Sequence, residues 1–173
     1  MMERETKILF KRRFIIALLI LFGALLQTTI GYMPSFFGAG VFLLIPECIC
    51  ISIFEGERWG AGFGMFAGAL WDLSHGGGDG YNALFMFLIC AVSGVLVRYL
   101  MQKNLITALF LSAAACFVYS LFYVMFFISA QGLGGTATLF VRCYFPTAII
   151  SWLFTFLFYF VFKGISKKYE IEY

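Results

Sequence analysis

Few residues in this chain could do chemistry: it has one histidine and a small number of charged side chains within long apolar stretches. His75 opens the segment HGGGDG, and a histidine followed by three glycines is the pattern of the oxyanion loop in some esterases. That chemistry also needs a nucleophilic serine, and the chain contains no G-x-S-x-G motif. A lone histidine cannot build a catalytic triad or a zinc site. We therefore predict no catalytic residue, no metal site and no cofactor, and we interpret the glycines as a tight turn.

Three other charged residues lie inside apolar segments, where a charge is costly and calls for a partner or a function. Asp72 and Arg142 fall near the outer ends of their expected helices and hence at similar depth. We expect them to pair; the alternative is that each reaches interfacial water separately. Glu47 lies deeper and must be protonated or partnered. It could belong to a proton or ion path, although no second deep acid or base accompanies it.

The element that positions Asp72 is a glycine-rich helix. Gly60, Gly64, Gly68 and Asp72 recur at every fourth residue and so form one ridge. Glycines at this spacing let the backbone of a neighbouring helix approach closely in lipid. We expect the ridge either to pack inside its own bundle or to contact a partner protein. Asn82 lies in the first turn of the next helix, where its side-chain oxygen could cap free backbone amides.

The composition of the chain places these helices in a membrane. Of the 173 residues, 62% are hydrophobic and 12% are charged, whereas a soluble domain is nearer half apolar and one quarter charged. Lipid must therefore cover the outside. The basic residues sit at the ends of apolar runs, which argues for membrane topology and against nucleic-acid binding. The five cysteines have no zinc-type spacing, and we interpret them as small membrane hydrophobes without a disulfide.

The apolar runs predict an all-α polytopic membrane protein, a single domain over residues 1–173 with six transmembrane helices. Runs of this kind can cross a hydrocarbon core of about 30 Å. A signal peptide is the alternative for the first run, but no small-x-small cleavage pattern follows it and more apolar runs do. Pro46 predicts a kink or a late helix start in the second span. The expected spans are approximately 14–33, 38–54, 59–74, 81–101, 105–129 and 139–163.

The distribution of basic residues predicts the orientation of these spans. With the amino terminus inside and six crossings, every Lys and Arg except Arg142 falls on the cytoplasmic side. This bias agrees with the positive-inside rule. We therefore expect both termini in the cytoplasm, and the HGGGDG loop, Asp72 and Arg142 toward the outer face.

The middle of the chain contains four distinctive segments: Pro46-Glu47, Gly62-Phe63, Gly68-Ala69-Leu70-Trp71-Asp72-Leu73 and Gly80-Tyr81-Asn82-Ala83-Leu84. Together they resemble the rod shape-determining protein MreD family. The family pattern is a proline-acid pair, a glycine-rich helix ending in Asp, and a glycine turn before an Asn-Ala-Leu helix start. The chain departs from the pattern with Glu47 where Asp is usual and Ala69 where a Gly-Leu pair is common.

The resemblance implies a non-enzymatic scaffold of lateral-wall peptidoglycan synthesis in the bacterial cytoplasmic membrane. Its implied partners are an MreC-like shape protein and, indirectly, the actin-like MreB filament and the elongation glycosyltransferase and transpeptidase pair. The fold of the family is similar to that of the compact six-helix substrate-binding subunits of energy-coupling-factor transporters. A small-molecule (vitamin)-binding transporter subunit is therefore the alternative function.

Overall fold

The computed structural model describes residues 2–29, 41–74, 80–128, 141–142 and 145–169, and within these residues the fold is all-helical. The first helix begins at Met2 instead of near residue 14, because the polar segment before the span is rich in Glu, Lys and Arg, which favour helix. The last helix runs on to Lys168 for the same reason. A π-helical segment, Val124–Ile128, continues the fifth expected span. The α-helices are α1 (Met2–Thr28), α2 (Leu44–Glu55), α3 (Glu57–Ser74), α4 (Tyr81–Tyr99), α5 (Leu105–Tyr123) and α7 (Phe145–Lys168).

Three helices in the described part of the chain are long and apolar enough to cross a membrane. These are α4, α5 continued to Phe126, and α7. In contrast, α2 has 12 residues and so measures roughly 18 Å along its axis, well short of a hydrocarbon core of about 30 Å. The expectation of six crossings and the likeness to energy-coupling-factor subunits both stay predictions.

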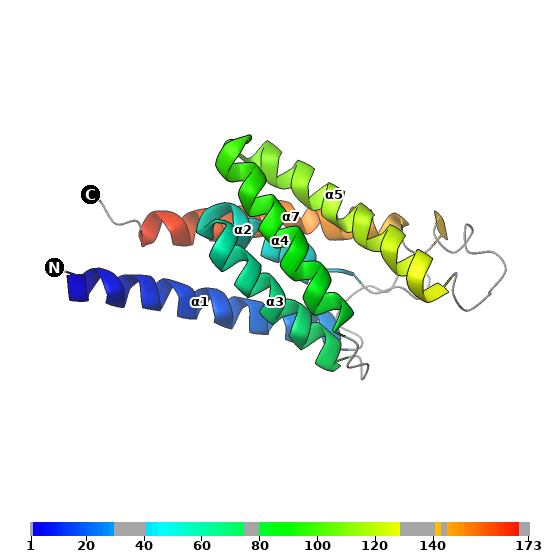
Figure 1. Cartoon of the computed structure of the whole chain (residues 1–173), viewed down its shortest axis with the longest axis horizontal. Coiled ribbons are helices and arrows are strands. Elements are labelled where there is room, and N and C mark those ends of the chain that lie inside the picture. Colours follow the sequence, from blue (N-terminus) through cyan, green and yellow to red (C-terminus); the bar gives the residue numbers. More distant parts are fainter. Residues whose placement is uncertain (1, 30–40, 75–79, 129–140, 143–144, 170–173) are drawn as a thin grey trace.

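The short helix α2 lies at the centre of the bundle (Figure 1). All residues from Leu44 to Ile53 are buried, and α1, α3, α4, α5 and α7 all pack against it. A helix that is apolar on every side is stable only when it is surrounded. Residues 41–43 are not helical and Pro46 lies in the first turn, so the late helix start predicted from Pro46 is confirmed. Proline is tolerated there because the first turn has no internal partner for its amide.

Side chains from neighbouring helices satisfy the backbone amides at the start of α2. The amide of Phe42 donates to Ser151 Oγ of α7 at 2.8 Å, and the amide of Leu44 donates to Gln27 Oε1 of α1 at 2.9 Å. No water is available in a bilayer core, so backbone groups at that depth need protein partners. These two bonds hold α1 and α7 against the same end of α2.

Small buried polar groups join the other helices. Ser52 Oγ of α2 donates to the carbonyl oxygen of Cys90 in α4 at 2.5 Å, and the hydroxyls of Ser112 and Thr155 are 2.7 Å apart between α5 and α7. Large apolar side chains cover the outer surfaces of α1, α4, α5 and α7, as expected for surfaces that face lipid. The start of α1 and the end of α7 lie at the same end of the molecule (Figure 1).

Candidate functional site

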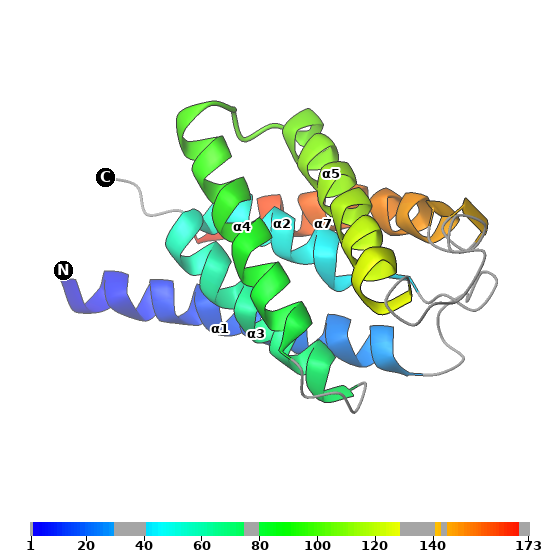
Figure 2. The same cartoon turned by 45° about the vertical axis from the view of Figure 1, so that its right-hand side comes forward.

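Helix α3 packs against α2 and α4 (Figure 2). The ridge glycines Gly60, Gly64 and Gly68 are buried and face these two helices. A Cβ added at Gly60 would lie 2.6 Å from Ser52 Cα, and one at Gly64 would lie 2.6 Å from the carbonyl oxygen of Met86. At Gly68, an added Cβ would lie 2.5 Å from Ala83 Cα. Real side chains do not approach backbone atoms this closely, so glycine is required at all three positions for the helices to pack as they do. In the structure, the ridge is a seam of the bundle itself.

Asp72, at the end of the ridge, caps the amino terminus of α4. Its Oδ1 accepts the backbone amide of Asn82 at 3.2 Å and its Oδ2 accepts the amide of Ala83 at 3.0 Å. These amides are among the first of α4 and have no carbonyl partner within their own helix. A carboxylate at this position also complements the positive end of the helix dipole. The acid therefore closes the α3–α4 hairpin from the preceding helix.

The side chain of Asn82 links this cap to α5 and does not itself cap the helix. Its Nδ2 donates to Asp72 Oδ1 at 2.8 Å, and its Oδ1 accepts the hydroxyl of Tyr119 at 2.8 Å. Our expectation that the Asn82 oxygen caps free amides is wrong, because Asp72 already accepts them. Tyr119 is buried among the rings of Phe42, Trp71, Tyr81, Phe85 and Tyr123. Nothing in the sequence distinguishes Tyr119, since it is one tyrosine among many aromatic residues.

The predicted pairing of Asp72 with Arg142 is wrong. Arg142 is exposed, and among the described residues the ion pairs join Arg12 to Glu55 and Arg98 to Glu57. Asp72 lies with both oxygens against the start of α4, where amides replace the expected cation. His75 and the following residues to Asp79 lie outside the described residues.

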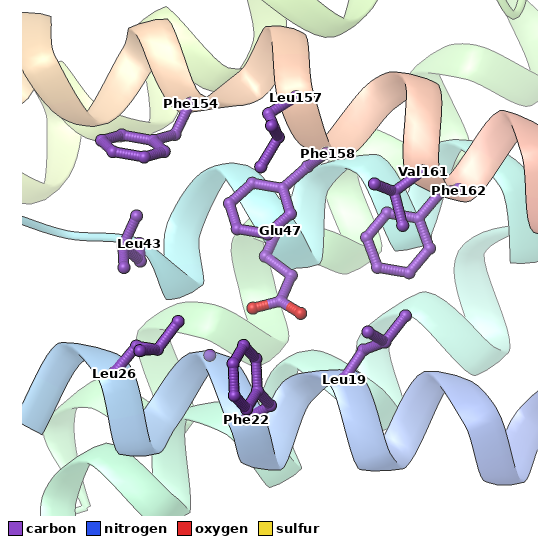
Figure 3. A pocket seen from close by; sticks show the side chains of 11 residues that line it. Leu19, Phe22, Leu26, Leu43, Glu47, Phe154, Leu157, Phe158, Val161 and Phe162 are labelled. Carbon is purple, nitrogen blue, oxygen red and sulfur yellow. The ribbon is translucent and has the colours of Figure 1, made fainter.

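Glu47 is the other acid that we expect within the membrane, and it faces a different direction from Asp72. The residue is 1% exposed, and its Oε2 has no hydrogen-bond partner among the residues that the structure describes. The carboxyl points from α2 into a gap between α1 and α7 (Figure 3). The structure thus places Glu47 away from the glycine ridge, so the candidate residues form two separate sites.

A third group of polar residues gathers where α1, α2, α3 and α4 meet at the end that carries the amino terminus. Arg12 of α1 forms an ion pair with Glu55 of α2, and the Arg13 guanidinium lies 3.6 Å from the centre of the Trp59 ring. Arg98 of α4 pairs with Glu57 of α3. Sequence reasoning treated these cations only as topology signals, since nothing in their spacing identifies their partners. They tie together the helix ends that we expect at the cytoplasmic surface.

The contacts observed at these sites are packing, hydrogen bonds, ion pairs and one contact between a cation and an aromatic ring. Within the described ranges, no group of three His, Cys, Asp or Glu side chains could hold a metal ion. The cysteines at positions 48, 50, 90 and 116 are buried and free.

In a comparison with protein-family models, residues 9–169 match the family described as rod shape-determining protein MreD. No curated protein and no solved structure matches the chain. The matched region includes the glycine ridge, Asp72, Asn82 and Glu47. The resemblance inferred from the sequence motifs is confirmed.

Proposed function

The chain belongs to the MreD family of rod shape-determining membrane proteins, and on that premise we propose that it is a non-enzymatic scaffold of lateral peptidoglycan synthesis. The family implies a role in determining rod shape. The observation that carries the proposal is the match over residues 9–169, which covers nearly all of the 173-residue chain. In this proposal the protein maintains rod shape by binding other membrane proteins, with no turnover and no transported substrate.

The distribution of polar groups supports a binding role. In the described part, the polar side chains inside the bundle are used mostly for packing: Asp72 and Asn82 close the α3–α4 hairpin, and Ser52 and Thr155 join helices. Recognition of partners must then use the outer faces of helices and the short connections, where a few desolvated polar groups set specificity. The proposed direct partner is an MreC-like shape protein, with the MreB filament and the wall-synthesis enzymes engaged through it.

Depletion of the protein from a rod-shaped host is expected to give rounded, swollen cells. Removing a scaffold of lateral synthesis leaves wall growth without its cylindrical pattern. The measurement is the ratio of cell length to width during depletion, with a plasmid-borne wild-type copy as the control that restores rods. Normal rods on full depletion, in a genome without a second copy, would overturn the cell-shape function. A vitamin retained by the purified protein would instead support the transporter-subunit alternative.

We further propose that both termini are cytoplasmic and that the chain crosses the membrane six times. The support is the bias of basic residues and the position of the Arg12, Arg13 and Arg98 contacts at one end of the bundle. Single cysteines at positions 79 and 134 in a cysteine-free background are expected to react with a membrane-impermeant maleimide applied from outside. Cysteines at positions 103 and 168 should be protected until the membrane is permeabilised. Reaction at position 103 in intact cells would contradict this topology.

A further inference from the structure

An apolar groove runs between α1 and α7, with α2 as its floor (Figure 3). Among the described residues that line it, Glu47 is the only one with an acidic or basic side chain. The groove encloses a cavity of about 200 Å³. Its rims are on the outer surface of the bundle: Phe22 of α1 and Leu157 of α7 are both 59% exposed. The other lining residues are Leu19, Gly23, Leu26, Leu43, Phe154, Phe158, Val161 and Phe162.

Glu47 is the feature of this groove that the bundle does not explain. The side chain is almost wholly buried, yet Oε2 has no hydrogen-bond partner among the described residues. Gly23 of α1 makes room for it, because a Cβ at that position would collide with the carboxyl group. A buried polar group without a partner is destabilising, and a bilayer has no water to relieve it. The lining of the groove therefore includes a buried carboxyl group whose hydrogen-bonding capacity the described part of the bundle leaves unused.

The depth of Glu47 identifies the kind of partner that could reach it. Glu55, at the far end of α2, pairs with Arg12 among the polar contacts at the end of the bundle. Glu47 lies about two helical turns from Glu55, roughly 12 Å along the axis, in a hydrocarbon core of about 30 Å. It is thus near the middle of the membrane, where lipid headgroups do not reach. An acyl chain could fill the cavity but would leave the carboxyl group without a partner.

Water is also a poor occupant of this cavity. A buried water molecule needs two to four polar partners, and Glu47 is the one charged residue in the lining. In size, the cavity suits a single side chain, since an apolar cavity of about 150 Å³ can hold a molecule as large as benzene. Polar side chains within a membrane pair with one another or with protein groups. A side chain from a second membrane protein can reach the depth of Glu47, fits the volume of the cavity and can bond to the carboxyl group.

We propose that the α1–α7 groove receives a transmembrane helix of a partner protein. One hydrogen-bond donor near the middle of that helix (Lys, Arg, His, Asn or Gln) enters the cavity and bonds to Glu47. The helix lies across the rims formed by Phe22 and Leu157. This inference rests on the proposed function as a partner-binding scaffold and assigns that function a site.

Replacing Glu47 with leucine separates a binding role from a packing role. Leucine has a similar volume and no group to desolvate, so the isolated protein is expected to accumulate and to melt at or above the wild-type temperature. If Glu47 served only the fold, its loss would lower the melting temperature. The complex is expected to weaken by about tenfold or more, as for loss of one hydrogen bond to a charged group.

The test is photo-crosslinking in the membranes of a rod-shaped host that expresses the full chain. Benzoylphenylalanine replaces Phe22 or Leu157 at the groove, or Leu88 of α4 as a control that is 53% exposed but does not line the groove. The crosslinked peptide is identified by mass spectrometry. Groove positions are expected to capture a transmembrane segment with a donor side chain near its midpoint, and Leu88 is not. The adduct should fall about tenfold or more with Glu47→Leu.

The Glu47→Gln variant reports the type of donor. It should retain the adduct when the donor is a neutral amide and lose it when the donor is a cation. Adducts formed only with lipid, or only with a second copy of this chain, would overturn the proposal. So would an adduct whose yield is unchanged by Glu47→Leu in a normally accumulated protein. The proposed function fails separately, through normal rods on depletion, and would be left intact by a negative groove result.

Discussion

Replacing Gly68 with leucine is expected to remove most of the protein from the membrane. A Cβ at this position already lies 2.5 Å from Ala83 Cα, and leucine adds a branched side chain at the same place. The obstructing atoms are backbone, so no side-chain rotation relieves the clash and α3 must separate from α4. Overpacking of this kind costs about 1–3 kcal/mol and sometimes more, a large fraction of the stability of a domain. A loss of that size reduces cellular abundance severalfold.

Gly62 provides a matched control on the same helix. Outside its own helix, no atom of the described residues lies within 4 Å of a Cβ built at Gly62, and the residue is exposed. Gly62→Leu should therefore accumulate like the wild type, measured by quantitative immunoblotting of membranes. An alanine pair sharpens the comparison, because Gly68→Ala should still lower the level while Gly62→Ala should not. Equal levels of Gly68→Leu and Gly62→Leu would show that close approach at Gly68 is not needed for the α3–α4 packing.

Replacing Asp72 with alanine is expected to lower the melting temperature of the detergent-solubilised protein by several degrees. The change removes the acceptor for the amides of Asn82 and Ala83 and for the Asn82 side chain. Loss of a helix cap costs about 0.5–2 kcal/mol, and an unsatisfied buried donor costs about 1–3 kcal/mol. For a protein of this size, about 1 kcal/mol corresponds to roughly 2–4 °C. The α3–α4 hairpin should loosen at that end while the glycine seam keeps the bundle folded.

Two conservative variants test whether the cap itself is responsible. Asp72→Asn keeps one carbonyl oxygen, so it should retain part of the stability that Asp72→Ala loses. Tyr119→Phe removes the donor to Asn82 Oδ1 but leaves both cap bonds, and its effect should be smaller. Melting can be followed by fluorescence-detected size exclusion after heating. A melting temperature for Asp72→Ala equal to that of the wild type would contradict the capping role.

The stability variants also serve as controls for the functional experiments. A variant that fails to support rod shape because it does not accumulate says nothing about partner binding. Gly68→Leu and Asp72→Ala are therefore best scored for protein level before cell shape. Glu47→Leu is expected to differ from both, with normal protein level and a lost partner contact.

The sequence by itself determined the class of the protein, the approximate helices and the family. Apolar runs and their periodicity are local properties, so α3 and α4 begin and end within a few residues of their predicted limits. Pro46 indicated the late start of α2 for an equally local reason, because proline has no backbone N–H to donate within a helix. The glycine ridge was also recognisable, because fourth-residue spacing places side chains on one face whatever the neighbours are.

Only the tertiary structure decided which neighbour each face and each polar side chain meets. A sequence pattern cannot tell a seam within the bundle from a surface for a partner, and the ridge is resolved only by the position of α4 against it. The expected partner of Asp72 was wrong because two residues at equal depth can lie on different sides of the bundle. In addition, the free amides at the start of a helix satisfy a carboxylate as well as a cation does. The position of Glu47 opposite Gly23 depends on how α1 and α7 flank α2. Such pairings join residues far apart in the chain, so the packing of the whole bundle determines them.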